Sequence, residues 1–277
     1  MPDYRLAVWS GVAFCLAAFY ATPCRAADLP EIVERATAMI ESHWAAALDY
    51  AYIERDETQK GATLTSKTSQ VVMMEGSDYY LPIAVNDQPL PADQENAEIR
   101  KVKSELQRRK NESSSAHRQR IENYMKQRDE NGALLFDFPN AFTFELIRED
   151  NVNGFPAYIL SATPKKRKGP LSRAAKVLGG MRGVVWINRE NFHAIGGDCT
   201  VVTPVPIYGI LARVLPGTHV RIEMAPVNDS TWLISRMSMT LTISKFFWFK
   251  STQVTRSTYS DYRPNAVVLD ELLAEGR

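Results

Sequence analysis

The alternation of hydrophobic and polar residues predicts a helix at the beginning of the folded chain. Within residues 28–47, Ile32, Ala36 and Ile40 recur at helical spacing and form one apolar face. Asp28 is a suitable N-cap residue for this helix. The pattern therefore predicts an amphipathic helix that packs its apolar face against the remainder of the fold.

After this helix, apolar and polar residues alternate with the period of β-strands. We expect strands at residues 48–59, 62–75, 79–85, 141–149, 155–163, 183–188, 192–202, 219–225, 231–243 and 254–262. Turn residues such as Lys60-Gly61 and Asn228-Asp229 separate neighbouring strands and predict hairpins. Residues 203–217, which contain three prolines, are expected to form a loop with a helical turn. Consecutive hairpins predict an antiparallel sheet and place the chain in the α+β class.

Residues 91–130 interrupt the strands with a stretch that is rich in charge and poor in large apolar side chains. It contains 10 Lys and Arg residues and 8 Asp and Glu residues, a mixture that is typical of solvated helices. Residues 111–115 predict a break between two helices, of which the first has a thin apolar stripe of Ile99, Val102 and Leu106. We expect a helical insertion over the sheet that buries little and is mobile.

The first 26 residues have the three parts of a secretory signal peptide. Arg5 precedes an apolar run at residues 6–21, and small residues follow up to Ala26 and Ala27. The alternatives are a membrane anchor and a lipoprotein. The apolar run is shorter than the about 20 residues that a spanning helix needs, and neither cysteine in this segment has a lipoprotein-like context. We therefore expect cleavage near Ala26 or Ala27 and a periplasmic protein.

Charge and cysteine content add two constraints. The chain has 33 Lys and Arg and 32 Asp and Glu residues, and removal of Arg5, Arg25 and Asp3 with the signal leaves 31 of each. A neutral protein exerts no general attraction on polyanions, so no nucleic-acid partner is expected. Of three cysteines, Cys199 alone would remain, and packing rather than an internal disulfide must then hold the fold.

The sequence contains none of the familiar patterns of catalysis or metal binding. Its four histidines stand far apart and lack zinc-like spacing to cysteines or carboxylates. It has no Gly-x-Ser-x-Gly motif and no phosphate-binding glycine loop, and Gly179-Gly180 and Gly196-Gly197 are interpreted as turns or bulges. We expect no enzyme activity, no catalytic residue, no metal and no cofactor. A hydrolase with an unfamiliar site is the remaining alternative.

A run of positive charge stands out between residues 164 and 182, where seven basic and no acidic residues occur. It begins with Lys165, Lys166, Arg167 and Lys168. Either this run lies in a solvated loop between strands, or it contacts an anionic surface such as lipid headgroups or an acidic partner.

Phe246, Phe247, Trp248 and Phe249 form a second conspicuous group, with a lysine on each side. If the adjoining strands form a hairpin, these aromatic residues lie near its tip and are candidates for contact with a membrane or a hydrophobic ligand. If the strand continues instead, alternate residues point to opposite faces and half of them enter the core.

Four short segments and the order of the expected elements resemble a known family. The segments are residues 86–90 (Asn-Asp-Gln-Pro-Leu), 183–188 (Gly-Val-Val-Trp-Ile-Asn), 227–233 (Val-Asn-Asp-Ser-Thr-Trp-Leu) and 259–263 (Tyr-Ser-Asp-Tyr-Arg). They are similar to sequences of bacterial periplasmic proteins of the LolA/LolB-like family of outer-membrane lipoprotein-sorting proteins.

This resemblance implies a single LolA-like domain over residues 28–265, built as a strongly curved antiparallel sheet, an unclosed barrel, with helices over its concave side. It also implies an apolar cavity between sheet and helices that holds acyl chains of lipids or lipoproteins. The candidate cavity residues are the strand aromatics Phe142, Phe144, Tyr158, Trp186 and Trp232.

Two functions follow from the resemblance. The first is a periplasmic carrier that binds lipid or lipoprotein acyl chains and makes transient contact with a membrane or an envelope protein. The alternative is a sensor or interaction module of the same fold, of the type that regulates envelope stress. Such a module would bind its partner through residues 91–130 or through the basic run.

Overall fold

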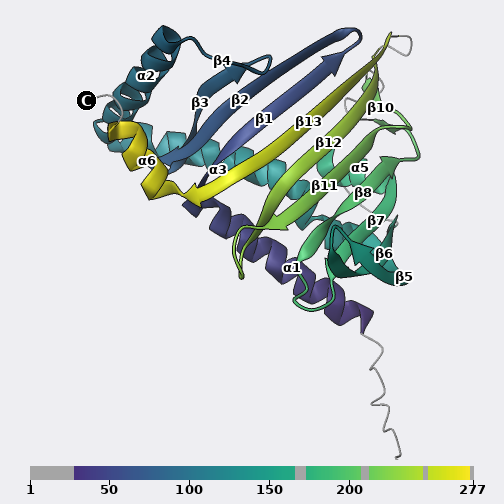
Figure 1. Ribbon diagram of the computed structural model, residues 1–277. Coiled ribbons are helices and arrows are strands. Elements are labelled where there is room, and N and C mark those ends of the chain that lie inside the picture. Colours follow the sequence, from purple (N-terminus) through teal and green to yellow (C-terminus); the bar gives the residue numbers. More distant parts are fainter. Residues whose placement is uncertain (1–27, 166–172, 207–211, 246–248, 275–277) are drawn as a thin grey trace, which may run out of the picture.

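The computed structural model describes residues 28–165, 173–206, 212–245 and 249–274 (Figure 1). The strands are β1 (Tyr50–Lys60), β2 (Thr63–Met74), β3 (Ser77–Val85), β4 (Gln88–Pro89), β5 (Phe142–Val152), β6 (Phe155–Pro164), β7 (Met181–Asn188), β8 (Ala194–Val201), β9 (Val205–Pro206), β10 (Ala212–Val214), β11 (His219–Pro226), β12 (Trp232–Lys245) and β13 (Phe249–Pro264). The helices are α1 (Leu29–Ala46), α2 (Ala92–Lys110), α3 (Ser114–Phe136), α4 (Phe138–Ala141), α5 (Arg173–Gly179) and α6 (Asn265–Ala274), with a 3-10 turn, η1 (Ala47–Asp49), after α1. The expected signal peptide lies outside the described residues.

The described strands form one antiparallel sheet that does not close on itself. Their order is β4-β3-β2-β1-β13-β12-β11-β8-β7-β6-β5, and β9 and β10 extend the sheet beside β12. β4 and β5 are the two edges, and they do not pair with each other. The predicted fold class, an unclosed, curved antiparallel sheet with helices, is confirmed. The sheet is not a simple meander, because β13 pairs with β1 and so joins the two ends of the chain.

One row of paired residues crosses eight strands and defines the face that we call the inner face. Side chains of directly paired residues lie on the same side of a sheet. The row consists of Leu160, Val185, Gly197, Ile222, Met237, Ser257, Asp56 and Lys67. Residues two positions away on each strand share this face, except beyond a bulge, and the alternate residues point to the outer face.

Four helices cover the inner face. Ile32 of α1 is buried against Leu160 of β6, and the Tyr124 hydroxyl of α3 donates a hydrogen bond to the Met73 Sδ of β2. α4 and α5 pack over the start of β5 and the end of β8. In Figure 1, α1 and α3 cross behind the strands. The helices that the sequence led us to expect over the sheet are therefore present.

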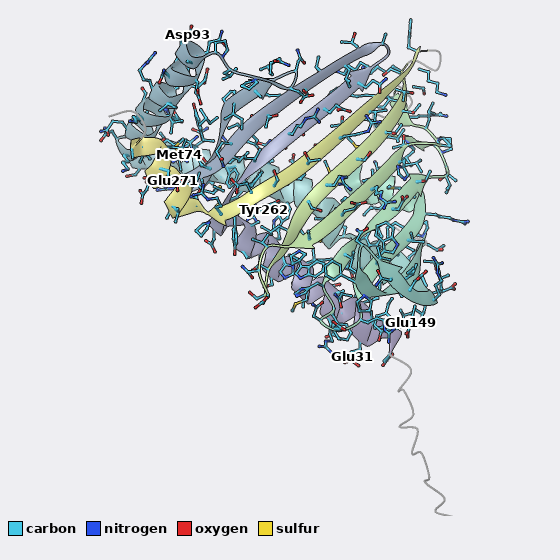
Figure 2. The ribbon with its side chains drawn as sticks, viewed as in Figure 1. Glu31, Met74, Asp93, Glu149, Tyr262 and Glu271 are labelled. Atoms are coloured by element: carbon cyan, nitrogen blue, oxygen red, sulfur yellow. The ribbon has the colours of Figure 1, made fainter. Side chains whose placement is uncertain are left out.

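Two helices lie on the other side of the sheet, where the resemblance predicts none. α2 and α6 pack on the outer face of β1, β2 and β3, and Met74 lies beneath them (Figure 2). This part of the outer face carries Ala51, Val72 and Leu81, which would be exposed to water without the two helices. The cover over β1–β3 therefore has a physical reason that local sequence patterns do not reveal.

Arg109 anchors the charged helical insertion to the sheet. Its Nη1 donates hydrogen bonds to the Met74 carbonyl oxygen at 2.8 Å and to the Ser77 carbonyl oxygen and Oγ at 2.9 Å. Its Nη2 donates to the Asp78 carbonyl oxygen, and its Nε donates to the Glu105 carboxylate at 2.7 Å. The side chain is only 8% exposed. A buried guanidinium with five acceptors holds α2 firmly on the β2–β3 turn.

Arg120 makes a similar contact from α3. Its Nη1 donates to the Ser77 Oγ at 2.7 Å, and its Nη2 donates to the Glu75 carbonyl oxygen and to Glu112. Val102 of α2 is fully buried as well. Few side chains of residues 91–130 are buried, as expected, and the two helices and the break near residue 111 are as predicted. The contacts of Arg109 and Arg120 nevertheless tie both helices to the β2–β3 turn.

Three further segments differ from the sequence-based expectation. Arg173–Gly179 is a helix, α5, where we expected only a loop. Within residues 203–217 the described parts form the short strands β9 and β10, where we expected a loop; the helical turn expected from the apolar stretch at residues 207–211 lies outside the described residues. The C-terminal helix α6 was not predicted, although its Val268 is buried against the sheet.

Candidate functional site

The buried apolar side chains form four separate clusters rather than one continuous core. They are centred on Phe142 under α4 and α5, on Leu160 under α1, on Met74 under α2 and α6, and on Trp186 near the β5–β6 hairpin. The inner face of the central strands β11 and β12 lies outside the buried part of every cluster. It is therefore the part of the helix-covered face that remains available to a ligand.

An apolar stripe runs along the inner face of β11 and β12. We define it as Val220, Ile222, Met237, Met239 and Leu241, all of which are partly exposed. Ile222 pairs with Met237, and Val220 pairs with Met239, so the two strands present these side chains together. Val220 and Leu241 border the Phe142 cluster, whereas the other three belong to no buried cluster of the described residues. Such a surface can take up apolar ligand atoms without first losing packing of its own.

A group of tyrosines adjoins the stripe on the inner face of β1, β3 and β13. It consists of Tyr52, Tyr80, Tyr259 and Tyr262, arranged around Glu54. The Glu54 Oε2 is buried and has no hydrogen-bond partner among the described residues. Burial, and next to it the charge of Asp56, raises the pKa of Glu54 to about 7. Near neutral pH, this wall of the site therefore does not present a fully ionised carboxylate to an apolar ligand.

α1 and α3 are joined where they cover the inner face. The Arg128 guanidinium of α3 donates a hydrogen bond to the Trp44 carbonyl oxygen of α1 and lies 4.7 Å from the centre of the Trp44 ring. Phe136 meets the same ring edge-on, with 5.6 Å between ring centres. The two helices therefore form one connected cover over the inner face.

The structure brings three of the predicted cavity residues together on the inner face. Phe142 is fully buried and stacks on Phe138 of α4, with 4.3 Å between ring centres. Phe144 is partly exposed and contacts Phe138 as well. Tyr158 lies under α1 in the Leu160 cluster. These aromatic side chains belong to packed clusters, so their contact with a ligand stays a prediction.

The other two predicted cavity residues lie elsewhere. Trp186 pairs with Ile159 and Gly196 on the outer face, where the Arg221 guanidinium lies 4.9 Å from its ring centre. Trp232 is 3% exposed and belongs to the same cluster as Trp186. Neither tryptophan joins the stripe, and we do not include them in the candidate site.

The aromatic and basic segments are only partly described. β12 and β13 form a hairpin, the first of the two alternatives, in which Lys245 pairs with Phe249, and the Phe249 side chain is 69% exposed. Phe246, Phe247 and Trp248 lie outside the described residues. Lys165 is exposed at the end of β6, whereas Lys166, Arg167 and Lys168 also lie outside them.

One depression in the described surface lies away from the inner face. Its volume is ≈ 540 Å³, and residues near the α2–α3 junction line it, among them Arg109, Glu112, His117 and Ile121. Arg109 and Glu112 are already paired with other residues of the chain. The depression is therefore a by-product of the ion pairs that anchor the insertion rather than a second apolar site.

Two buried histidines hold the end of α1 on the sheet. The His43 Nε2–H donates a hydrogen bond to the Ser230 carbonyl oxygen at 3.2 Å, and the His43 ring centre lies 4.7 Å from that of His193. His193 stacks on Trp232. Burial, and next to it the neighbouring His43, lowers the pKa of His193 to about 4, and burial also lowers the pKa of His43. Both rings are therefore neutral in the folded protein at neutral pH.

We predict that this pair makes the fold sensitive to acid. Unfolded histidine titrates near pH 6.5, so the contribution of His193 to stability is complete above that pH and is lost as the pH falls toward about 4. The pKa of Glu54 is raised, so protonation of Glu54 increases the stability of the fold as the pH falls from about 7 to about 4.5 and partly offsets the loss from His193. Urea unfolding between pH 7 and pH 4 should therefore show a smaller stability loss for His193→Gln than for the wild type, and equal losses would contradict the prediction.

The described residues lack a metal-binding cluster and an apolar spanning helix. No three His, Cys, Asp or Glu side chains of this part of the chain are grouped so that they could hold a metal ion. No helix among the described residues has the length and apolar character needed to cross a membrane.

Comparison with known proteins gives matches among solved structures alone. No protein-family model and no curated protein sequence matches the chain. Matching structures include a LolA superfamily protein, NE2245, from Nitrosomonas europaea, with 12% identity, a TM-score of 0.33, and coverage of 84% of this chain and 92% of that one. A putative outer membrane lipoprotein-sorting protein domain from Vibrio parahaemolyticus matches with 14% identity, a TM-score of 0.34, and coverage of 86% and 99%.

A third match is the complex of MucA and MucB from Pseudomonas aeruginosa. It has 10% identity and a TM-score of 0.22, and it covers 83% of this chain and 98% of that one. Solved structures of the family that the sequence resembles are thus among the matches. TM-scores of this size do not transfer a ligand or a partner to this chain.

Proposed function

We propose that this chain is a periplasmic carrier that binds acyl chains of lipids or lipoproteins against the inner face of its sheet. The observation that carries the proposal is the apolar stripe of β11 and β12, whose side chains are partly exposed beneath a cover of helices. Each methylene group that moves from water onto such a surface contributes about 0.8 kcal/mol. An acyl chain has enough of them to give useful affinity without any specific polar contact.

The composition of the stripe suits a flexible, linear ligand. Met237 and Met239 have unbranched, polarisable side chains that adapt to ligands of varied shape. Gly183 of β7 and Gly197 of β8 lie on the same face as the stripe. Because they have no side chains, they leave space beside the stripe for a ligand. The tyrosine group on the other side offers hydroxyls for the polar end of a ligand.

The proposal predicts lipid in the purified protein and its loss when the stripe is filled. The protein is isolated from the periplasm of its native host and extracted, and bound lipid is measured by mass spectrometry. Ile222→Trp and Met237→Trp should lower the amount of lipid per protein severalfold, because the larger rings occupy the space over the stripe.

The matched control is Ser238→Trp, which adds the same ring to the outer face of β12. Its lipid content should equal that of the wild type. An absence of lipid from the wild type, or equal loss from the inner-face and outer-face variants, would refute the proposed carrier function.

One observation favours the alternative, a sensor or interaction module of the same fold. The insertion is fastened to the sheet by Arg109 and Arg120, so that its many exposed charges are displayed on a rigid surface. A fixed charged surface suits recognition of a protein partner. A stably folded wild type that carries no lipid would favour this alternative.

A further inference from the structure

The tips of two neighbouring hairpins form a surface that the proposed carrier function does not use. The β1–β2 tip includes Lys60 and Leu64, and the β12–β13 tip includes Lys245, Phe249 and Lys250; we call these five residues the hairpin rim. Because Lys60 pairs with Gln253, the two tips lie at the same end of the sheet on neighbouring strands, and the β12–β13 hairpin extends beyond the β1–β2 tip to the pair Lys245 and Phe249 (Figure 1). Leu64 is 57% exposed and Phe249 is 69% exposed, and all three lysines are exposed.

The hairpin rim is basic, whereas the turns at the opposite end of the strands carry charges of both signs. The sequence contains no Asp or Glu between residues 230 and 260, and none of the described residues in the two tips is acidic. Lys165 and Arg182 lie at the same end of the sheet, since β6 ends and β7 begins there. The turns at the other end carry exposed acidic residues, namely Glu75, Asp150, Glu190 and Asp229, and Glu149 lies toward that end as well (Figure 2). Arg148 and Arg189 are exposed at that end too and form ion pairs with Asp150 and Glu149, so it carries charges of both signs, whereas the hairpin rim carries positive charge alone.

The apolar stripe leads to the hairpin rim. Along β12, Met237, Met239, Leu241 and Ile243 alternate on the inner face, and Lys245 follows at the tip. Phe249 pairs with Lys245, so its side chain lies on the same face as the stripe. An apolar track thus connects the centre of the inner face with the most exposed aromatic residue of the described chain.

We propose that the hairpin rim docks on an anionic phospholipid bilayer. Lysine side chains interact favourably with acidic headgroups, and an aromatic side chain between them enters the interfacial region. No acidic side chain of the tips opposes this contact. This proposal rests on the proposed carrier function and extends it. A docked rim would give an acyl chain a continuous apolar path from the bilayer to the stripe.

Vesicle co-sedimentation tests the docking surface. The chain from Asp28 onward, which contains every described helix and strand, is mixed with phosphatidylcholine vesicles that contain or lack phosphatidylglycerol. We expect binding to the anionic vesicles alone. Lys245→Gln/Lys250→Gln should weaken it about 30-fold at low salt, corresponding to roughly 2 kcal/mol, and Phe249→Ala should weaken it about tenfold.

Matched controls remove the same charge, or truncate another exposed apolar side chain, elsewhere on the molecule. Lys110→Gln/Lys126→Gln removes two exposed lysines from α2 and α3, and Ile147→Ala truncates a side chain of β5 that is 49% exposed. Both controls should bind anionic vesicles as the wild type does. The proposal is overturned if neutral vesicles bind equally well, if no vesicle binds, or if the rim variants bind as tightly as their controls.

Lipid content separates failure of the docking surface from failure of the carrier function. Lys245→Gln/Lys250→Gln leaves the stripe unchanged, so the purified variant should accept acyl chains that are supplied in detergent as the wild type does. Loss of vesicle binding with intact acyl-chain uptake supports the docking surface. Normal vesicle binding by a protein that never takes up acyl chains contradicts the carrier function alone.

Discussion

Arg109→Ala is expected to lower the free energy of unfolding by about 3 kcal/mol. The substitution removes five hydrogen bonds and leaves the carbonyl oxygens of Met74, Ser77 and Asp78 beneath α2 without their donor. Buried acceptors that lose a charged donor cost more than the bond itself contributed, because water does not replace the donor fully. Urea unfolding at neutral pH measures the loss.

The neighbouring residue provides a matched control. Arg108 contacts Glu105 as Arg109 does, and hydrogen bonds from Arg108 first and then Arg109 lower the pKa of Glu105 to about 2. The Arg108 side chain, however, is 56% exposed, and exposed ion pairs contribute about 0–1 kcal/mol. Arg108→Ala should therefore change stability by less than about 1 kcal/mol. Equal effects of the two substitutions would show that burial of the guanidinium does not determine its contribution.

The same variant tests whether the insertion is mobile. The charged composition of residues 91–130 predicts loosely held helices, whereas the contacts of Arg109 and Arg120 indicate fixed ones. Amide hydrogen exchange in α2 should be slow in the wild type and faster in Arg109→Ala. Fast exchange in the wild type would restore the interpretation of α2 as a mobile segment.

Much of the fold follows from local patterns, and the errors come from contacts between distant segments. Alternating residues and turn signals predict the hairpins β1–β2, β5–β6 and β11–β12, because each needs only neighbouring residues to form. The pairing of β1 with β13 joins residues about 200 positions apart in sequence, and no local pattern specifies it. Local patterns also do not specify the side of the sheet on which α2 packs. Arg109 lies on the same helix face as Val102 and Leu106, at helical spacing. Its burial could therefore have been predicted from the sequence.

The sequence predicts the kind of site, an apolar surface between sheet and helices, but not the residues that form it. The aromatic residues of the strands suggested Trp186 and Trp232. The register of β7, however, places Trp186 on the outer face, and Trp232 lies beyond the bulge at Ser235 of β12 and packs in the Trp186 cluster. The signal that was missed is the strict alternation of Met237, Met239 and Leu241 with Ser238, Thr240 and Thr242. That pattern marks a strand with one apolar and one hydrated face. It does not reveal that the apolar face lies between the buried clusters, which depends on where four helices pack.

Gly183→Ala is expected to destabilise the protein by about 3 kcal/mol, comparable to the loss of Arg109. A Cβ atom at this position would overlap the Asp198 carbonyl oxygen and lie 2.5 Å from the Cys199 Sγ and 2.7 Å from the Cys199 Cα. Two of these three atoms are backbone, so rotation of a side chain cannot relieve the clash. β8 must instead move away from β7, and it must do so where β7 and β8 are both covered by packed residues. Thermal unfolding should show a midpoint about 10 °C lower than that of the wild type.

Gly179→Ala is the control that distinguishes the effect of the steric clash from the effect of replacing a glycine by alanine. Gly179 ends α5, and a Cβ atom there would meet nothing within 4 Å, so stability should stay within about 0.5 kcal/mol of the wild type.

The two variants also differ in their expected effect on function. Gly183 lies two positions from Val185 on β7, and β8 pairs with the strand that carries Val220 and Ile222. A shift of β8 therefore moves one wall of the apolar stripe, and Gly183→Ala should hold less lipid than Gly179→Ala when both are folded at low temperature. Equal lipid content would mean that the stripe tolerates displacement of its neighbouring strand and that its methionines, rather than the fixed position of β8, determine what it binds.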